Sequence, residues 1–258
     1  MSLLQSLGLR RAPARPALAR DFHCHLLPGV DDGMRTLDEA REAIAGLRRL
    51  GYRGGVLTPH IYPGVYDNDA AGLRAAFAEF RSQIGEDYAL WLAAEYHVTD
   101  ALFERIAEDD LLHVPLGDRR LVLVEFPSLM PAPRGIDALA ALARAGYQPV
   151  LAHAERYRYL QTDPEPWLER IARHGTWVQC NIGSLAGLYG EGPRTFAQDL
   201  LARGLPVLWG TDLHRPRQIE RYIAPGLDRL GGVGRLNAVL DALEEAEAER
   251  PPASRETV

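Results

Sequence analysis

The chain has 258 residues, 47% of them hydrophobic and 25% charged, which is typical of a globular protein that buries a full core. Its formal net charge of −6 argues against a general nucleic-acid-binding protein, because such proteins need a basic surface. The chain contains no lysine, which excludes Schiff-base chemistry and a carbamylated-lysine metal bridge.

The two ends of the chain differ in composition from its middle. Residues 1–19 are rich in Arg, Pro and Ala, so we expect a flexible basic arm, and we expect a disordered tail over 250–258. The first residues lack the apolar core and charge order of a secretory signal, and no apolar run is as long as a membrane span. Two cysteines, Cys24 and Cys180, fit a reducing compartment. We therefore predict a cytoplasmic protein with one domain over 20–249.

Between these ends, short apolar runs alternate with amphipathic segments. The run DFHCH (21–25) is predicted to be a buried strand, and the helix after it begins at Thr36, with a capping box to Glu39, and ends at Gly51. Further strands are predicted over 54–60, 88–96, 119–126, 149–156, 176–184 and 205–214. Further helices are predicted over 70–85, 101–110, 135–147, 164–175 and 233–249. Seven apolar runs separated by helices, without a dinucleotide-type glycine motif, favour an α/β fold in which parallel strands form a barrel.

Nearly every predicted strand ends on a His, Glu or Asp. His23 and His25 share one face of an extended chain, and Asp212 and His214 repeat this spacing. In such barrels the carboxyl ends of the strands meet at one mouth. We therefore expect one cluster of candidate metal ligands: His23, His25, His60, Glu95, Glu125, His153, Asp212 and His214.

The mixture of ligand types indicates which metals and which reaction to expect. Imidazole and carboxylate ligands suit manganese, iron or zinc rather than calcium, and eight ligands suit two or three divalent ions. Taken singly, each ligand has an alternative: His60 could close a turn, and Glu125 could pair with an arginine. A cluster of this kind makes a hydroxide from a bridging water and clamps the oxygens of the displaced group. Its residual positive charge favours a phosphate monoester.

Arginines near two of the strand ends are candidates for binding that phosphate. Arg156 lies three residues after His153, and Arg217 lies three residues after His214. Either guanidinium can bind phosphate as a two-pronged donor. Arg215 lies close to Arg217, so which of these two contacts phosphate stays open.

Seven motifs occur in order from about residue 21 to residue 217: DFHCHLLPGVDDG, TPH, AAEY, LVEF, AHAER, NIGSLAGLYG and TDLH. Together they resemble the bacterial metal-dependent tyrosine-protein phosphatases of the polymerase-and-histidinol-phosphatase (PHP) superfamily. The resemblance implies a distorted seven-stranded β/α barrel, TIM-like and of the PHP type. It also implies a site of three metal ions, usually manganese, that hydrolyses phosphotyrosine in proteins.

The resemblance further implies a partner and roles for single residues. Members of the family that the chain resembles oppose autophosphorylating tyrosine kinases that control capsule or exopolysaccharide synthesis. The eight ligands carry over by motif, and His214 is also a candidate for acting on the leaving group. Two departures are visible: Ala154 stands where the family often has Pro, and Arg217 is not in clear register with the family's arginine.

Other functional classes predict different features. A histidinol-phosphate phosphatase of the same superfamily shares the metal site and differs in its substrate loops, where Tyr62, Tyr66 and Asp67 either receive an aromatic ring or pack locally. An inactive metal-binding regulator predicts a degraded ligand set, and this set looks complete. A cysteine-dependent tyrosine phosphatase needs Cys and Arg separated by five residues, but the positions concerned are Val30 and Ala186.

Overall fold

The strands form two sheets in the computed structural model of the protein, which describes residues 20–116, 118–131, 134–203 and 207–232. A three-stranded parallel sheet has the order β1 (Arg20–Cys24), β2 (Gly54–Leu57) and β4 (Ala89–Leu92). The larger sheet has the order β10 (Val207–Gly210), β9 (Trp177–Asn181), β8 (Gln148–Leu151), β7 (Arg119–Glu125), β5 (Glu95–His97) and β3 (His60–Ile61). These neighbours are parallel, and β6 (Val114–Leu116) adds an antiparallel strand to β7. The prediction of a mixed α/β fold with parallel strands is confirmed.

The chain connects the two sheets directly, and hydrogen bonds join them at the β1 edge of the smaller one. The chain runs from β2 almost directly into β3, and from β4 into β5. At the β1 edge, the Asp212 amide donates a hydrogen bond to the His23 carbonyl at 2.7 Å, and the His25 amide donates to the Leu213 carbonyl at 3.1 Å. Strand pairing still leaves two sheets, so a single closed seven-stranded sheet is not found within the described residues.

The predicted strands over 54–60 and 88–96 are each two short strands. Pro59 has no amide hydrogen to give to a sheet, and the chain passes from the smaller to the larger sheet at this point. His60 therefore opens β3 instead of ending the strand before it, and Glu95 likewise opens β5. The two residues are direct partners in the β3–β5 pair, so the change of sheet brings them side by side.

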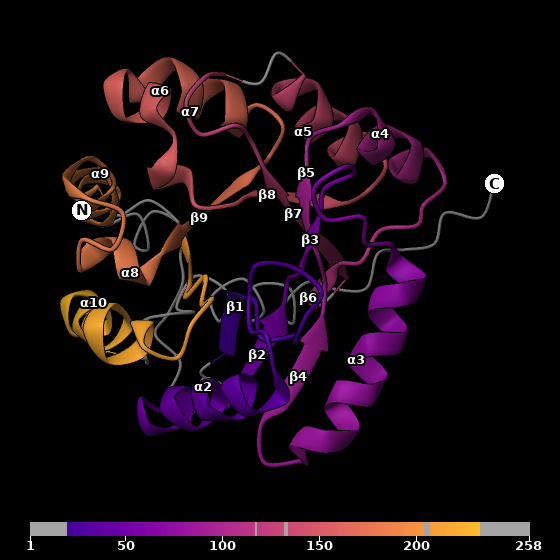
Figure 1. The fold of residues 1–258 in the computed structure, drawn as a ribbon. Helices are drawn as coiled ribbons and strands as arrows, with labels where there is room; N and C mark the ends of the chain where they lie inside the picture. Colours follow the sequence, from indigo (N-terminus) through magenta and orange to yellow (C-terminus); the bar gives the residue numbers. More distant parts are fainter. Residues whose placement is uncertain (1–19, 117, 132–133, 204–206, 233–258) are drawn as a thin grey trace, which may run out of the picture.

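Helices surround the strands in the view of Figure 1. Five of them lie where the sequence predicts helices: α2 (Leu37–Arg49), α3 (Ala70–Ile84), α4 (Asp100–Ala107), α5 (Gly135–Arg144) and α7 (Pro164–Ala172). The predicted cap of α2 is present, because Thr36 Oγ1 accepts a hydrogen bond from the Glu39 amide at 3.2 Å. Gly51 follows the end of α2 with a φ of 98°, a conformation that favours glycine.

Further helical segments lie outside the predicted ranges. They are the 3₁₀ turn η1 (Ala154–Arg156), α6 (Arg158–Thr162), α8 (Ile182–Leu185), α9 (Glu191–Ala202), the π-helical turn η2 (Ile219–Ile223) and α10 (Ala224–Leu230). The buried residues of α9 are Phe196, Ala197 and Leu200, which lie on one face of the helix. The predicted helix over 233–249 and the end segments 1–19 and 250–258 lie outside the described residues.

One apolar cluster draws side chains from both sheets. It includes the buried Phe22 of β1, Val56 of β2, Leu123 of β7 and Leu208 of β10. A larger cluster joins the helices to the strands. Because apolar side chains pack on both faces of the strands, the residues at the strand ends have fixed positions.

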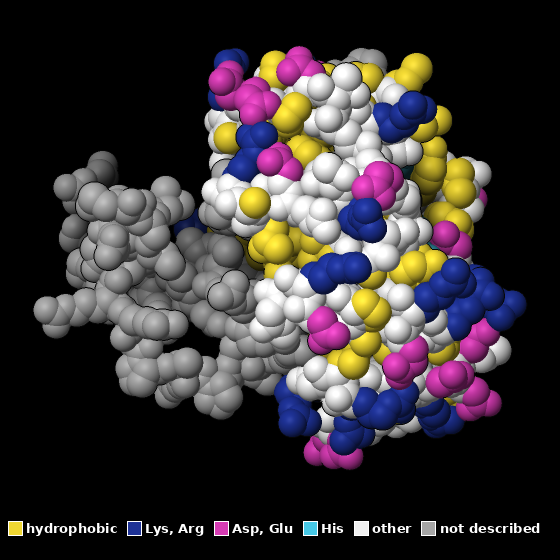
Figure 2. All heavy atoms as spheres, turned by 90° about the vertical axis from the view of Figure 1, so that its left-hand side faces the viewer, with side chains coloured by type: hydrophobic (Ala, Val, Ile, Leu, Met, Phe, Trp, Pro, Cys, Tyr) yellow, Lys and Arg dark blue, Asp and Glu magenta, His cyan; other side chains and the backbone are white. Residues whose placement is uncertain are grey.

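The surface carries both signs of charge. On the face that carries α8, α9 and α10, Figure 2 shows acidic and basic side chains near one another, with apolar ones between them. None of the helices in the described ranges has both the length and the apolar composition that crossing a membrane requires.

Candidate metal centre

The eight side chains predicted as metal ligands lie together at the ends of the strands. They come from β1 and the residue after it, from the first residues of β3 and β5, from the end of β7, and from the segments after β8 and β10. A cavity of about 350 Å³ opens beside them. Glu95, Glu125 and Asp212 line this cavity together with His60 and His214. The structure thus brings the eight side chains into one cluster.

The most buried group consists of His23, His25, Glu95 and Asp212, none of them more than 1% exposed. The two histidine Nε2 atoms lie 3.1 Å apart. Glu95 Oε2 lies 3.1 Å from the Nε2 atom of His23 and 3.4 Å from that of His25. Asp212 Oδ1 lies 3.4 Å from both nitrogens. Four ligand atoms that face one point in this way can surround a cation.

The opposite edges of the two imidazoles show that this group fits a metal. His23 Nδ1 is 3.0 Å from Gln179 Oε1, and His25 Nδ1 is 2.8 Å from Asp31 Oδ2. Both partners are acceptors, so each Nδ1 carries the hydrogen and each Nε2 turns a lone pair toward the centre. Metal-binding histidines are usually held in this way by an acceptor on the far ring nitrogen.

The charges in this group also favour a cation. Burial alone would lower the pKa of His23, but the Glu95 and Asp212 carboxylates outweigh it and raise the pKa to about 9. Burial would raise the pKa of both carboxyl groups, yet the neighbouring histidines hold each pKa well below its usual range. The carboxylates therefore require positive charge beside them, supplied either by protons on the imidazoles or by cations in their place.

A second group contains His60, Glu95 and Glu125. His60 Nδ1 lies 3.3 Å from Glu95 Oε2 and 3.6 Å from Glu125 Oε1. His153 Nε2 adds to this group at 2.7 Å from Glu95 Oε1. The Nδ1 atom of His60 is buried and has no hydrogen-bond partner among the described residues, which is expected of an atom whose partner is a metal ion.

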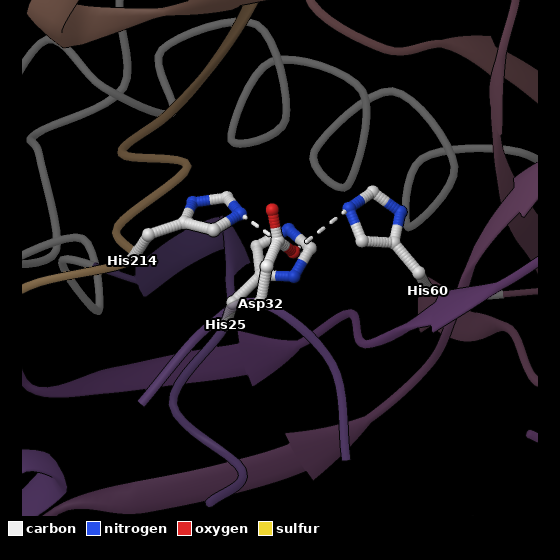
Figure 3. Close-up of side chains that lie close together, drawn as sticks. All are labelled: His25, Asp32, His60 and His214. Carbon is white, nitrogen blue, oxygen red and sulfur yellow. Dashed lines mark ion pairs between the residues drawn. The ribbon is translucent and has the colours of Figure 1, made fainter. Parts of the chain in front are cut away.

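A third group contains Asp32, which lies in the DFHCHLLPGVDDG motif but is not among the eight predicted ligands. Figure 3 shows Asp32 between His60 and His214, with His25 beside it. Asp32 Oδ1 lies 3.5 Å from His60 Nε2 and 3.4 Å from His214 Nε2. His25, His60 and Glu95 each belong to two of the three groups, so the groups overlap.

Two of the ligand residues have unusual backbone conformations. His153 has a φ of 30° and Asp212 a φ of 50°, in the left-handed region that residues other than glycine seldom adopt. The amide of His153 donates to Gln179 Oε1 at 2.8 Å, and the amide of Asp212 donates to the His23 carbonyl. Hydrogen bonds within the site therefore hold this backbone in place, as is common where strain serves a function.

The second oxygen of Asp212 accepts three hydrogen bonds. Asn181 Nδ2 donates at 2.6 Å, the Tyr189 hydroxyl at 2.9 Å and Arg156 Nη1 at 3.2 Å. The guanidinium of Arg156 also lies 4.5 Å from the centre of the Tyr189 ring. Arg156 lines the cavity, so this predicted phosphate ligand is held beside the candidate metal ligands.

The other two arginines do not line this cavity. Arg217 lines a separate cavity of about 330 Å³ together with Arg35 and Glu42. Arg215 lies against the same second cavity, and its Nη1 atom contacts the carbonyl oxygens of Asp32, at 2.7 Å, and of Gly33. The prediction that Arg217 contacts the phosphate therefore has no support in its position, and Arg215 holds the backbone beside Asp32.

Several residues that complete the site do not belong to the predicted set. Asp32 could have been found, because it follows His25 closely and its motif was recognised. The others orient ligands: Asp31, Gln179, Asn181, Tyr189 and His97. Asp31 lies in the DFHCHLLPGVDDG motif, and Asn181 and Tyr189 lie in NIGSLAGLYG, but only the folded chain reveals which ligand each of them contacts.

The chain is similar in sequence to proteins of known function. A family model described as "Capsular polysaccharide synthesis, CpsB/CapC" matches residues 19–229. The tyrosine-protein phosphatase YwqE of Bacillus subtilis is 33% identical over 198 residues, which cover 75% of this chain and 76% of YwqE. The tyrosine-protein phosphatase CpsB of Streptococcus pneumoniae is 30% identical over 218 residues, covering 81% of this chain and 88% of CpsB.

A solved structure has the same fold as this chain. It comes from work on YwqE of Bacillus subtilis and CpsB of Streptococcus pneumoniae, described there as unique metal-dependent tyrosine phosphatases. It superimposes with a TM-score of 0.74 at 26% sequence identity, covering 88% of this chain and 92% of the other.

Proposed function

The chain belongs to the CpsB/CapC family of capsular polysaccharide synthesis, and from this premise we propose that it is a metal-dependent tyrosine-protein phosphatase. One observation carries the proposal: three overlapping groups of imidazole and carboxylate atoms lie beside a cavity that Arg156 also lines. Grouped divalent cations next to an arginine suit the dianionic phosphate of a monoester.

We also infer that the two sheets together make up a distorted seven-stranded β/α barrel. Counting β2 with β3 and β4 with β5 gives seven parallel strands. The backbone hydrogen bonds from Asp212 to His23 and from His25 to Leu213 link β1 and His25 to the segment that follows β10. The apolar cluster shared by both sheets fits the interior of such a barrel.

We propose that the site holds two or three divalent cations, with manganese as the natural metal and iron or zinc as substitutes. The three groups described above supply the ligands, and their mixed nitrogen and oxygen donors suit these metals. When bound, such cations activate water at neutral pH and neutralise the charge of the phosphoryl group.

Arg156 is proposed to orient the phosphoryl group. Its bond to Asp212 and its stacking on Tyr189 fix the guanidinium at the cavity, which leaves its other N–H donors for phosphoryl oxygens. Nearby Asp212 outweighs burial and raises the pKa of Arg156, so its charge is permanent.

His214 has one ring nitrogen available to the site. Its Nδ1 atom lies 2.9 Å from the Asp212 carbonyl, so only Nε2 faces Asp32 and the cavity. Binding a cation and protonating the leaving oxygen exclude each other at this one atom. We propose that Nε2 is a ligand together with Asp32, since a phenolate with a pKa near 10 departs more easily than an alkoxide.

The proposed reaction does not use cysteine. Cys24 and Cys180 are both fully buried, and the Cys24 thiol donates to the Val56 carbonyl at 3.2 Å. Burial raises the pKa of both thiols well above the usual range, so neither is a nucleophilic thiolate. Two buried thiols that form no disulfide support the proposal that the protein acts in the cytoplasm.

The proposed substrate is a phosphotyrosine protein, and the proposed partner is an autophosphorylating tyrosine kinase of capsule or exopolysaccharide synthesis. The names of the relatives and of the family support the phosphotyrosine substrate and the link to capsule synthesis, and the kinase follows from the resemblance noted for the sequence motifs. The competing function is a small-molecule phosphatase of the histidinol-phosphate type, which would use the same cations.

A comparison of substrates on one preparation tests the proposal. The manganese-loaded protein should show a higher kcat/KM for phosphotyrosine peptides than for histidinol phosphate. Efficient turnover of histidinol phosphate with negligible turnover of the peptides would favour the competing function. Metal binding without turnover of either substrate would indicate an inactive regulator.

A further inference from the structure

Two tyrosines that line the cavity are each stacked on a histidine. The Tyr66 ring lies over His60 with 5.2 Å between centroids and 11° between planes. The Tyr62 ring lies over His97 with 3.9 Å between centroids and 18° between planes. Both tyrosines line the cavity, so a ligand in the cavity can contact both tyrosine rings.

The segment that carries the tyrosines is held by its own backbone. The Tyr62 amide donates to the Tyr66 carbonyl at 3.1 Å, and the Tyr66 amide donates back to the Tyr62 carbonyl at 2.8 Å. The turn between them is closed by a hydrogen bond from the Gly64 amide to Asp67 Oδ1 at 2.6 Å. Asn68 Nδ2 ties the segment to the His60 carbonyl at 2.8 Å. The tyrosines are therefore part of an ordered wall.

His97 connects this wall to the candidate metal ligands. It is the direct partner of Glu125 in the β5–β7 pair, and its Nδ1 atom lies 3.2 Å from Glu125 Oε1. A carboxylate only accepts hydrogen bonds, so Nδ1 is the donor. The side chains of His97 and Glu125 are only 14% and 17% exposed. One imidazole thus orients Glu125 with its edge and supports Tyr62 with its face.

Starting from the proposed phosphatase function, we propose that His97 is a positioning residue that adapts this site to aryl phosphates. Its Nδ1–H orients Glu125 toward the cations, as hydrogen bonds to ligating carboxylates commonly do. Its ring holds Tyr62 flat at the cavity, where the aromatic ring of the substrate stacks on it. The ligand class of this wall is a planar aromatic ring that carries a phosphate or phosphonate.

Two substitutions separate the two contacts of His97. His97→Phe keeps a ring beneath Tyr62 and removes the donor to Glu125. His97→Asn keeps an N–H near the position of Nδ1 and removes the ring. His113→Asn serves as the matched control, because His113 is also a half-buried histidine with an Nδ1 hydrogen bond and an aromatic neighbour, but these partners are the Leu111 carbonyl and the Tyr147 ring, neither of which lines the cavity.

Three readouts do not depend on turnover. The first is the Kd of manganese, measured by calorimetry; the second is the ratio of affinities for phenylphosphonate and methylphosphonate; the third is the melting temperature. His97→Phe should weaken manganese binding by about tenfold or more and leave the phosphonate ratio unchanged. His97→Asn should bind manganese like the wild type and lower the ratio by roughly two- to tenfold. Tyr62→Leu should reproduce the second pattern, and His113→Asn should change neither quantity.

The opposite results are equally clear. If both His97 variants change the same quantity to the same extent, or if neither changes manganese binding or the ratio, the proposal is wrong. A loss of stability in one variant shows in its melting temperature, and Tyr62→Leu then still tests the wall. A wild-type protein that does not hydrolyse phosphotyrosine would refute the proposed function, while the phosphonate and manganese titrations still decide the role of His97.

Discussion

The Nε2 atoms of His23 and His25 lie 3.1 Å apart, each with its far ring nitrogen against an acceptor from elsewhere in the chain. Two imidazoles that face each other so closely, with carboxylates around them, form a pocket for positive charge. The alternating geometry of β1 brings the pair together, and Gln179 and Asp31 set its orientation. The residues that orient the ligands therefore matter nearly as much as the ligands.

Gln179 gives the first prediction. Its Oε1 atom accepts from the His23 ring and from the His153 amide, so Gln179→Leu should weaken manganese binding by about 10- to 100-fold. Gln179→Glu retains an acceptor and should lose less. Calorimetric titration of both variants checks this, and manganese binding by Gln179→Leu that equals the wild type would contradict it.

A pair of arginines gives the second prediction. Arg156→Ala should lower kcat/KM for phosphotyrosine peptides by about 100-fold, because it removes a donor held at the cavity and the guanidinium that bonds to Asp212. Arg217→Ala is the matched control and should leave kcat/KM unchanged, because Arg217 lines the second cavity. Steady-state kinetics on both variants decide this. A large loss in Arg217→Ala would restore the expectation from sequence that this arginine contacts the phosphate.

The third prediction concerns the dependence of stability on pH. Burial raises the pKa of Asp21 from 3.8 to about 6, although hydrogen bonds from Thr211 and His23 act to lower this pKa. Between about pH 4 and pH 6 the folded protein holds a proton that the unfolded chain has released. The contribution of Asp21 to stability therefore falls as pH rises through this window, by up to about 3 kcal/mol.

Asp21→Asn removes this titration and keeps an acceptor for the Thr211 amide. Urea unfolding of the variant and the wild type at pH 4.5 and pH 7.5 gives the test, since the difference between the proteins cancels the other titrations. The free energy of unfolding of Asp21→Asn, taken relative to that of the wild type, should be higher at pH 7.5 than at pH 4.5. A difference that does not change with pH would refute the assignment.

The candidate ligands were accessible to sequence reasoning because they follow local rules. His23 and His25 are two residues apart on an extended chain, so the face they share follows from strand geometry. Asp212 and His214 repeat the spacing, but they lie after β10, where Asp212 has a left-handed backbone conformation. The apolar runs also located the parallel strands. The change of sheet at Pro59 escaped prediction, because a continuous apolar run does not reveal where the chain changes its pairing partner.

The residues that sequence reasoning missed, and the difference in position between Arg156 and Arg217, depend on tertiary contacts. Arg156 and Arg217 have the same three-residue spacing from a histidine, but only the first ends a 3₁₀ turn, η1, beside the cavity. After β10, Arg215 contacts the loop at Asp32 and Gly33. Arg217 follows two residues later and lines the other cavity. His97 meets Glu125 only because β5 pairs with β7. Spacing along the chain contains none of this information.

The measurement that tests the central claim most directly is the metal content of the purified protein, taken together with its phosphotyrosine phosphatase activity before and after chelation. The protein should contain more than one equivalent of a divalent transition metal, because no single ion can use the three ligand groups. Chelation should abolish the activity, and manganese should restore it. A metal-free preparation that hydrolyses phosphotyrosine at the full rate would contradict the account.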